Sequence, residues 1–114
     1  MTIDKADFAP GTLVEHGGGH YSLIYSEFPD FSDVFDPKGL QGGGYTWHGM
    51  VMHLLEENAP EALDALDFDP EAGMFCALSD DLDALRAVAR MLVKLESRAA
   101  VADIVANVDL TEYD

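Results

Sequence analysis

The histidines are the first residues of this chain that could support chemistry, because neutral imidazole is a common zinc ligand. His16 and His20 flank three glycines and lie close to Glu15, so a tight turn would bring these side chains together. His48 and His53 are five positions apart, about 140° around a helix, and cannot share one ligand face. A metal-dependent enzyme using His16, His20 and Glu15 is therefore one hypothesis. A third convincing ligand is lacking, and we expect neither a metal nor a cofactor.

The other reactive groups form no recognisable catalytic set. Cys76 lies in the apolar run MFCAL without a cationic neighbour that would lower its thiol pKa, so we expect it to pack as a small hydrophobic residue. No serine or cysteine stands at a familiar spacing from a histidine and an acid. With 22 Asp and Glu residues, pairs of carboxylates arise by chance, and none lies in an evident apolar pocket. We expect that the protein is not an enzyme.

The stretch GLQGGGYTWHG, residues 39–49, raises the question of a phosphate-binding loop. Such a loop follows a strand and usually has a lysine nearby, whereas here a short aromatic segment precedes it and the next lysine is Lys94. We instead expect the glycines to fold the chain tightly against the start of a helix. That arrangement would bring Tyr45 and Trp47 to the edge of the core, where either ring packs internally or anchors a binding partner.

The charge of the chain favours a basic partner. Six Lys and Arg stand against 22 Asp and Glu, which gives a formal net charge of −16 and a pI near 4.2. Such a surface repels nucleic acid and anionic membranes and attracts cationic proteins. We therefore expect a basic protein partner, no nucleic acid and no membrane. An acidic regulatory module whose charge reflects a salt-adapted proteome is the alternative.

The acidic residues cluster at three places in the sequence. A cluster that opens a helix, with Asp80, Asp81 and Asp83, is partly explained by the helix dipole. The other two have no such explanation, and a partner of opposite charge would offset their repulsion. They consist of Asp30, Asp33 and Asp36, and of Asp64, Asp67, Asp69 and Glu71.

The pattern of apolar residues predicts an α+β fold. Alternation and turn residues predict two β-hairpins, one across GGG and one across PEAG, and apolar spacing of three and four predicts helices. Thr46 is the expected N-cap of the first long helix, and MFCAL the expected central strand with both faces covered. We expect residues 1–114 to form one domain with an antiparallel sheet built from two hairpins and helices packed on one face. The lone cysteine and the lack of a signal-like start predict a cytoplasmic protein.

Two stretches, GGGYTWHGM and FDPEAGMFCALSDD, each followed by a helix, resemble the immunity protein 51 family of antidotes encoded beside toxins of bacterial polymorphic toxin systems. The resemblance runs from the first hairpin to the last helix. Its markers are Gly42, Gly44, Tyr45, Trp47, Phe68, Asp69, Glu71, Gly73, Met74 and Phe75. Thr46 stands where the family pattern G-x-G-Y-D-W has an acid.

The resemblance implies a toxin-neutralising role in an α+β fold, with no catalytic residues to carry over. Many toxins of such systems are nucleases with basic clefts, which an acidic protein would suit. We therefore predict that the chain binds and neutralises a cognate toxin domain, itself basic, through its acidic surface. The residues predicted to contact the toxin are Asp30, Asp33, Asp36, Tyr45, Trp47, Asp67, Asp69 and Glu71.

Overall fold

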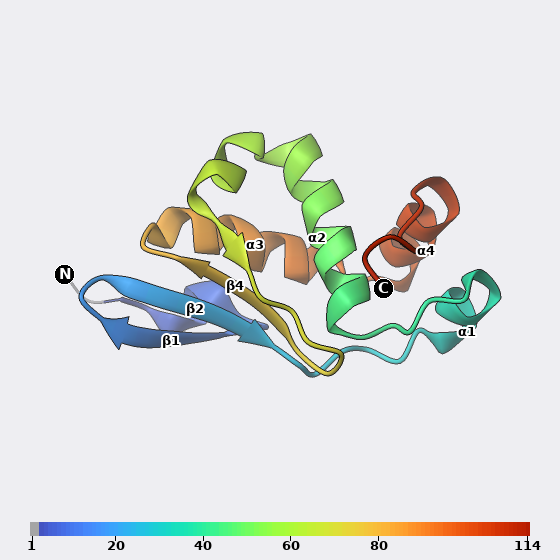
Figure 1. Ribbon diagram of the computed structural model, residues 1–114, viewed down its shortest axis with the longest axis horizontal. Helices are drawn as coiled ribbons and strands as arrows, with labels where there is room; N and C mark the ends of the chain where they lie inside the picture. The colour runs from blue at the N-terminus through green and yellow to red at the C-terminus, as the bar shows by residue number, and fades with distance from the viewer. Residues whose placement is uncertain (1–2) are drawn as a thin grey trace.

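A computed structural model describes residues 3–114 and shows one four-stranded antiparallel sheet with helices (Figure 1). The strands are β1 (Thr12–Gly17), β2 (His20–Tyr25), β3 (Asp67–Phe68) and β4 (Phe75–Ser79). Their order across the sheet is β1-β2-β4-β3. The predicted α+β class, with an antiparallel sheet made of two hairpins, is confirmed.

The first hairpin forms where alternation and glycines predict it. Leu13 pairs with Leu23 and Glu15 with Tyr21 across the two strands. Gly17, Gly18 and Gly19 have φ values of 83°, 64° and 80°, a region that residues with a side chain rarely occupy. The three glycines therefore allow β1 to reverse directly into β2.

The second hairpin, formed by β3 and β4, joins the sheet next to β2. β4 pairs with β2 through Tyr25 and Phe75 and with β3 through Phe68 and Ala77, so it is central as predicted. β3 has only two residues, and an isolated bridge between Glu71 and Met74 closes the turn beyond it.

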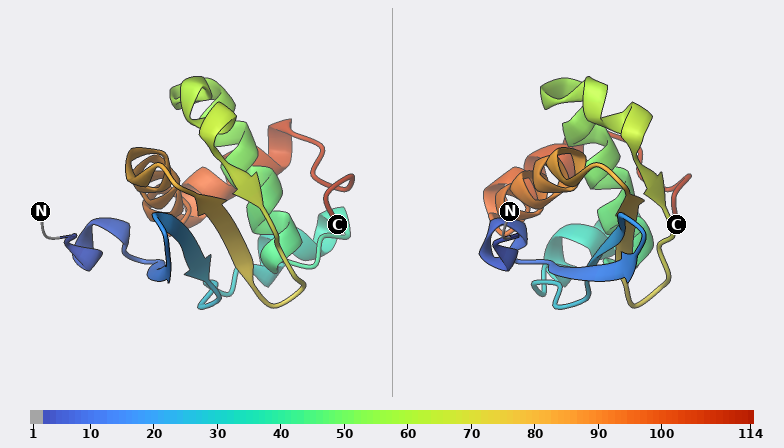
Figure 2. Two further views of the ribbon diagram at one scale, coloured as in Figure 1. Left: turned by 60° about the vertical axis from the view of Figure 1, so that its left-hand side comes forward. Right: turned by 90° about the vertical axis from the view of Figure 1, so that its left-hand side faces the viewer.

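The helices pack on one face of this sheet. In Figure 1, α3 lies behind β4, and it contacts both β4 and β2; the turned views in Figure 2 show the sheet curving around the helices. None of the helices described is long and apolar enough to cross a membrane. The helical elements are η1 (Lys5–Phe8), α1 (Ser32–Phe35), η2 (Asp36–Lys38), α2 (Gly44–Asn58), η3 (Pro60–Ala65), α3 (Leu82–Lys94) and α4 (Arg98–Asn107).

The core lies between the sheet and the two long helices. Leu23 and Phe75 of the sheet, Trp47 and Val51 of α2 and Leu85 of α3 are all 0% exposed. α3 carries the clearest apolar stripe of the chain, and Asp81 caps its start by accepting hydrogen bonds from the backbone of the first turn.

The start of α2 differs from the expectation. The helix begins at Gly44 with Gly43 as N-cap, so the prediction of Thr46 as N-cap is wrong. The Gly44 N–H donates to the carbonyl of Ala72 at 3.0 Å, which joins the helix start to the turn of the second hairpin. With Thr46 as N-cap the helix would begin at Trp47, three residues later than it does.

The close approach explains why glycine stands at two of these positions. A Cβ at Gly43 would overlap the carbonyl oxygen of Ala72, and a Cβ at Gly44 would overlap those of Glu71 and Met74. The glycine-rich stretch is therefore a packing surface for the hairpin turn.

Because of this contact, we expect Gly44→Ala to lower the free energy of unfolding by at least about 1 kcal/mol and typically by about 1 to 3 kcal/mol, the cost of forcing a methyl group into a packed site. Urea unfolding followed by the fluorescence of buried Trp47 measures the loss. Gly73→Ala is the matched control, because a Cβ there would meet no described atom within 4 Å. Equal losses in the two variants would contradict the packing explanation.

Candidate functional site

The sheet face turned away from the helices, called the open face below, is the main candidate surface. Ser22 on β2 is paired with Leu78 on β4, and Ile24 is paired with Cys76, so these four side chains share the face opposite Leu23 and Ala77. In Figure 1, no described helix lies in front of β2 and β4. The expectation that both faces of the MFCAL strand are covered by other elements is therefore wrong.

A hollow of about 650 Å³ occupies this face. Its floor contains two small side chains, Ser22 and Cys76, which their neighbours leave 4% and 6% exposed. Leu78 lies beside them, and Asp67 and Asp69 of the β3 edge line the wall. The hollow thus combines a floor of small side chains with acidic groups at its side, and His16 and His20 also belong to its lining.

The reactive groups on the floor of the hollow are the Ser22 hydroxyl and the Cys76 thiol. Burial, followed by the nearby Asp69 carboxylate, raises the pKa of the Cys76 thiol, which favours its protonated form. His16 Nε2 lies 2.5 Å from Ser22 Oγ, which holds the imidazole against the sheet. Within residues 3–114, no three His, Cys, Asp or Glu side chains lie close enough to hold a metal ion.

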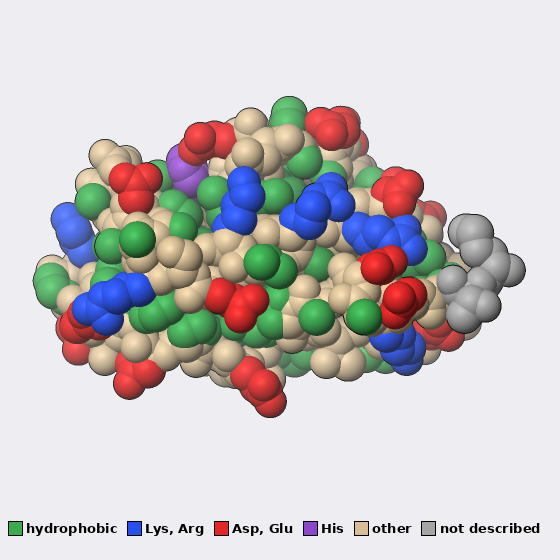
Figure 3. Space-filling model, turned by 180° about the vertical axis from the view of Figure 1, so that it is seen from behind, with side chains coloured by type: hydrophobic (Ala, Val, Ile, Leu, Met, Phe, Trp, Pro, Cys, Tyr) green, Lys and Arg blue, Asp and Glu red, His purple; other side chains and the backbone are tan. Residues whose placement is uncertain are grey.

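Positive charge is confined to the helical parts of the molecule. Lys5, Lys38, Arg98 and the row Arg86, Arg90 and Lys94 on α3 all belong to helical elements. Seen from behind the view of Figure 1, these side chains follow one another across the molecule (Figure 3). Residues 39–85 contain no lysine or arginine but ten acids, Glu56, Glu57, Glu61, Asp64, Asp67, Asp69, Glu71, Asp80, Asp81 and Asp83. Five of these acids, Glu56, Glu57, Glu61, Asp64 and Asp83, belong to helical elements. Asp67, Asp69 and Glu71 belong to the second hairpin, whose strands contain no lysine or arginine.

The second acidic cluster lies at the open face. Asp67 and Asp69 flank Phe68, whose ring points to the core beside Phe75, so both carboxylates point the other way. Both acids and Glu71 are exposed. The structure therefore brings the three predicted residues together along one edge of the sheet.

The first acidic cluster lies apart, around α1. Asp30, Asp33 and Asp36 are exposed, and the side chain and backbone N–H of Ser32 lower the pKa of Asp30. Asp33 forms an ion pair with Arg98 of α4. One of these three carboxylates already has a cationic partner within the chain, so this cluster is less free to attract another.

The two predicted aromatic residues differ in their placement. Tyr45 is partly exposed in the first turn of α2, beside the Gly44 contact with the hairpin turn. Trp47 is fully buried, with its ring 4.9 Å from Phe28 and 5.7 Å from Phe35 between centroids. The prediction that Trp47 contacts a partner is therefore corrected, since its ring supports the glycine segment from inside the core.

Thr46 is buried and connects the glycine segment to Asp114. Its hydroxyl accepts from the Gly42 N–H at 3.0 Å and donates to Asp114 Oδ1 at 2.8 Å. The other oxygen of Asp114 accepts from the Gln41 N–H at 2.9 Å. A hydroxyl and a distant carboxylate together hold the backbone of the glycine segment here.

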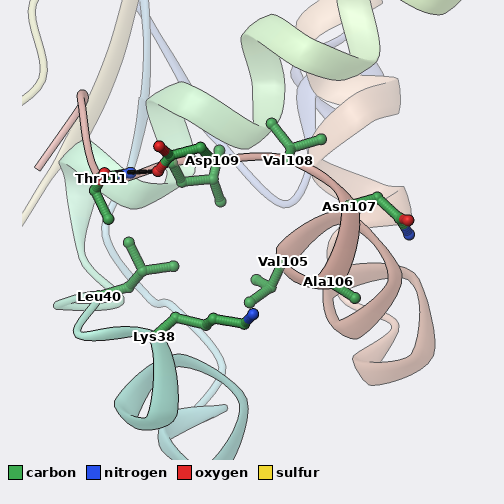
Figure 4. Close-up of a pocket in the computed structure, with 9 residues that line it drawn as sticks. Lys38, Leu40, Val105, Ala106, Asn107, Val108, Asp109 and Thr111 are labelled. Atoms are coloured by element: carbon green, nitrogen blue, oxygen red, sulfur yellow. Dashed lines mark hydrogen bonds between the residues drawn. The ribbon is translucent and has the colours of Figure 1, made fainter.

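A second cavity lies between η2 and the end of α4 (Figure 4). Its volume is about 280 Å³, and Leu40, Val105 and Val108 contribute to its lining. Asp109 beside it already accepts from the backbone N–H and the hydroxyl of Thr111. We therefore assign this cavity no chemistry.

Sequence reasoning did not identify Ser22 and Leu78 as part of a surface. The signal was present in the alternation of β2, where Tyr21, Leu23 and Tyr25 point to one side and Ser22 to the other. Which side lacks a helix depends on tertiary packing, which alternation alone does not reveal.

The sequence model of one protein family, described as immunity protein 51, matches residues 12–109. The match includes all four strands and the helices α1 to α4, so the chain belongs to the immunity protein 51 family. No curated protein and no solved structure matches the chain significantly.

The Thr46 network predicts that Thr46→Val costs about 1 to 3 kcal/mol, because the Gly42 N–H and Asp114 lose their partner in a part-buried site. Thermal or urea unfolding measures the change. Thr12→Val, the same substitution at an exposed strand position, is the control and should change stability by less than about 0.5 kcal/mol. Similar losses at both positions would show that the hydroxyl network contributes little.

Proposed function

We propose that this protein is an immunity protein that binds a cognate bacterial toxin domain and neutralises it through an acidic surface, in the cytoplasm of the producing cell. The observation that carries the proposal is the family match over residues 12–109. The charge of the chain supports it, since a net charge of −16 favours a cationic partner.

The distribution of charge gives the proposal a physical mechanism. Strands β1 to β4 carry no lysine or arginine, and Asp67, Asp69 and Glu71 are exposed along the edge of their sheet. An anionic surface of this kind raises the association rate of a cationic protein by roughly 10 to 1000-fold at low salt. The acids would thus speed capture of the toxin.

Slow release requires contacts that exclude water, and these come from apolar and aromatic side chains. Tyr45 is the predicted aromatic residue that remains accessible, whereas Trp47 is enclosed. Asp30 and Asp36 add negative charge at a second position near α1. We propose that Tyr45 and these acids lie at the rim of the interface, where they contact the toxin directly or through bound water.

Co-expression with the toxin domain encoded beside this gene tests the function. We expect growth to stop when the toxin is expressed alone and to recover when this protein is present. The purified pair should associate at least about tenfold more slowly when the salt concentration rises from 50 to 500 mM, because added ions screen the steering charges.

The control for this experiment is an unrelated immunity protein of similar size, which should leave the toxin active. Toxicity that persists with the wild-type protein, or a neighbouring product that is harmless on its own, would contradict the proposed function. An association rate that is indifferent to salt would contradict the acidic mechanism alone.

A further inference from the structure

Building on the proposed function, we propose that the hollow of the open face receives an arginine or lysine side chain of the toxin. The function above assigns an acidic surface as a whole, whereas this inference assigns one binding site within it and the chemistry of its ligand.

The shape of the hollow suits a long side chain with an apolar stem. Ser22 and Cys76 are small and lie at its floor, and Leu78 borders them. On one side Ala65 forms part of the wall, held to the sheet because Ser79 Oγ donates to its carbonyl at 2.6 Å. Arginine and lysine bury their methylene groups against apolar surface of this kind and keep the charged end at the polar rim.

The charge of the rim determines which side chain fits. Asp67, Asp69 and Asp80 line the hollow, and all three are exposed. None of the salt bridges of the described residues involves these acids. The Asp69 carboxylate also acts on the floor, since it contributes to the raised pKa of the Cys76 thiol. A cation is therefore the complementary ligand, and a guanidinium offers several donors to these carboxylates.

The other hollows are less suited to a cation. The groove between α2 and α4 contains Lys94 and already has His53 paired with Glu57. The cluster around α1 has Arg98 bound to Asp33, and the cavity in Figure 4 is lined by Lys38. Each of these sites contains or adjoins a lysine or arginine of the chain itself. The lining of the open-face hollow contains neither, and its basic groups are the imidazoles of His16 and His20.

The edge of the sheet favours side-chain insertion over strand addition. β3 consists of two residues, and Pro70 follows soon after, so little unpaired backbone is offered to a partner strand. Recognition at this edge must therefore come mainly from side chains, of which Asp67 and Asp69 are the charged ones on the open face.

The first test needs no toxin and uses N-acetyl-arginine amide as the probe, titrated into isotope-labelled protein and followed by NMR. We expect progressive shifts of the amide signals of Ser22, Cys76 and Leu78, with weak, saturable binding. The uncharged isostere N-acetyl-citrulline amide should cause none of these shifts. The double variant Asp67→Asn with Asp69→Asn should lose at least about two thirds of the shift, because two of the charged partners are gone.

A variant that loses the same number of charges at the other acidic cluster distinguishes binding in the hollow from general attraction between opposite charges. Asp30→Asn with Asp36→Asn removes the same charge elsewhere, and we expect the probe to shift the hollow as in the wild type. Shifts spread evenly over both clusters would overturn the proposal, as would equal effects of the two double variants. So would self-association through this face, visible as a dimer in sedimentation.

The second test uses the toxin domain and separates this inference from the function beneath it. We expect the Asp67 and Asp69 double variant to associate with the toxin at least about tenfold more slowly than the Asp30 and Asp36 variant. If both variants protect cells as well as the wild type does, the proposed function stands and the site is wrong. If the wild type itself fails to bind, the function is wrong, while the arginine probe still reports on the site.

Discussion

The backbone contact between the glycine segment and the second hairpin turn is the constraint on which the rest of the structure depends. Gly43 and Gly44 lie against the carbonyl oxygens of Ala72 and its neighbours, at a distance that no side chain would allow. This contact fixes the start of α2 against the sheet and directs Trp47 into the core. The glycine segment and the turn of the second hairpin are thus the two sides of one packing contact.

The arrangement that follows from this contact separates charge across the molecule. Because the helices cover one face, the basic row of α3 lies on the helical side and the acids of β3 lie at the open face. All six lysines and arginines belong to helical elements and none to a strand, so the acids of the second hairpin have no lysine or arginine beside them in the sheet, which favours attraction for a cationic surface. Fold and charge together therefore support one side of the protein as its binding side.

Local patterns in the sequence predicted much of the fold. Alternation and the glycines at 17–19 predicted the first hairpin, and the apolar stripe predicted α3. The strand order was not predictable, because β2 pairs with β4 across about fifty residues and no local signal specifies that partner. The start of α2 was misplaced for a similar reason, since the partner of Gly44 is a distant turn.

The candidate site was predictable in part. The acids Asp67, Asp69 and Glu71 were identified from clustering alone, and the structure groups them on one edge. The sequence could not show whether the Trp47 ring is buried or exposed, because its position in the helical pattern is the same in both cases. Arg98 lies far from Asp33 in the chain, so their ion pair, which distinguishes the two acidic clusters, required the tertiary structure.

Hydrogen exchange of the free protein and of its complex with the toxin domain tests the central claim most directly. If the toxin binds at the open face, binding slows exchange in residues 65–72, next to the hollow, and leaves α4 unchanged. Slower exchange confined to α3 and α4, with residues 65–72 unaffected, would contradict that claim.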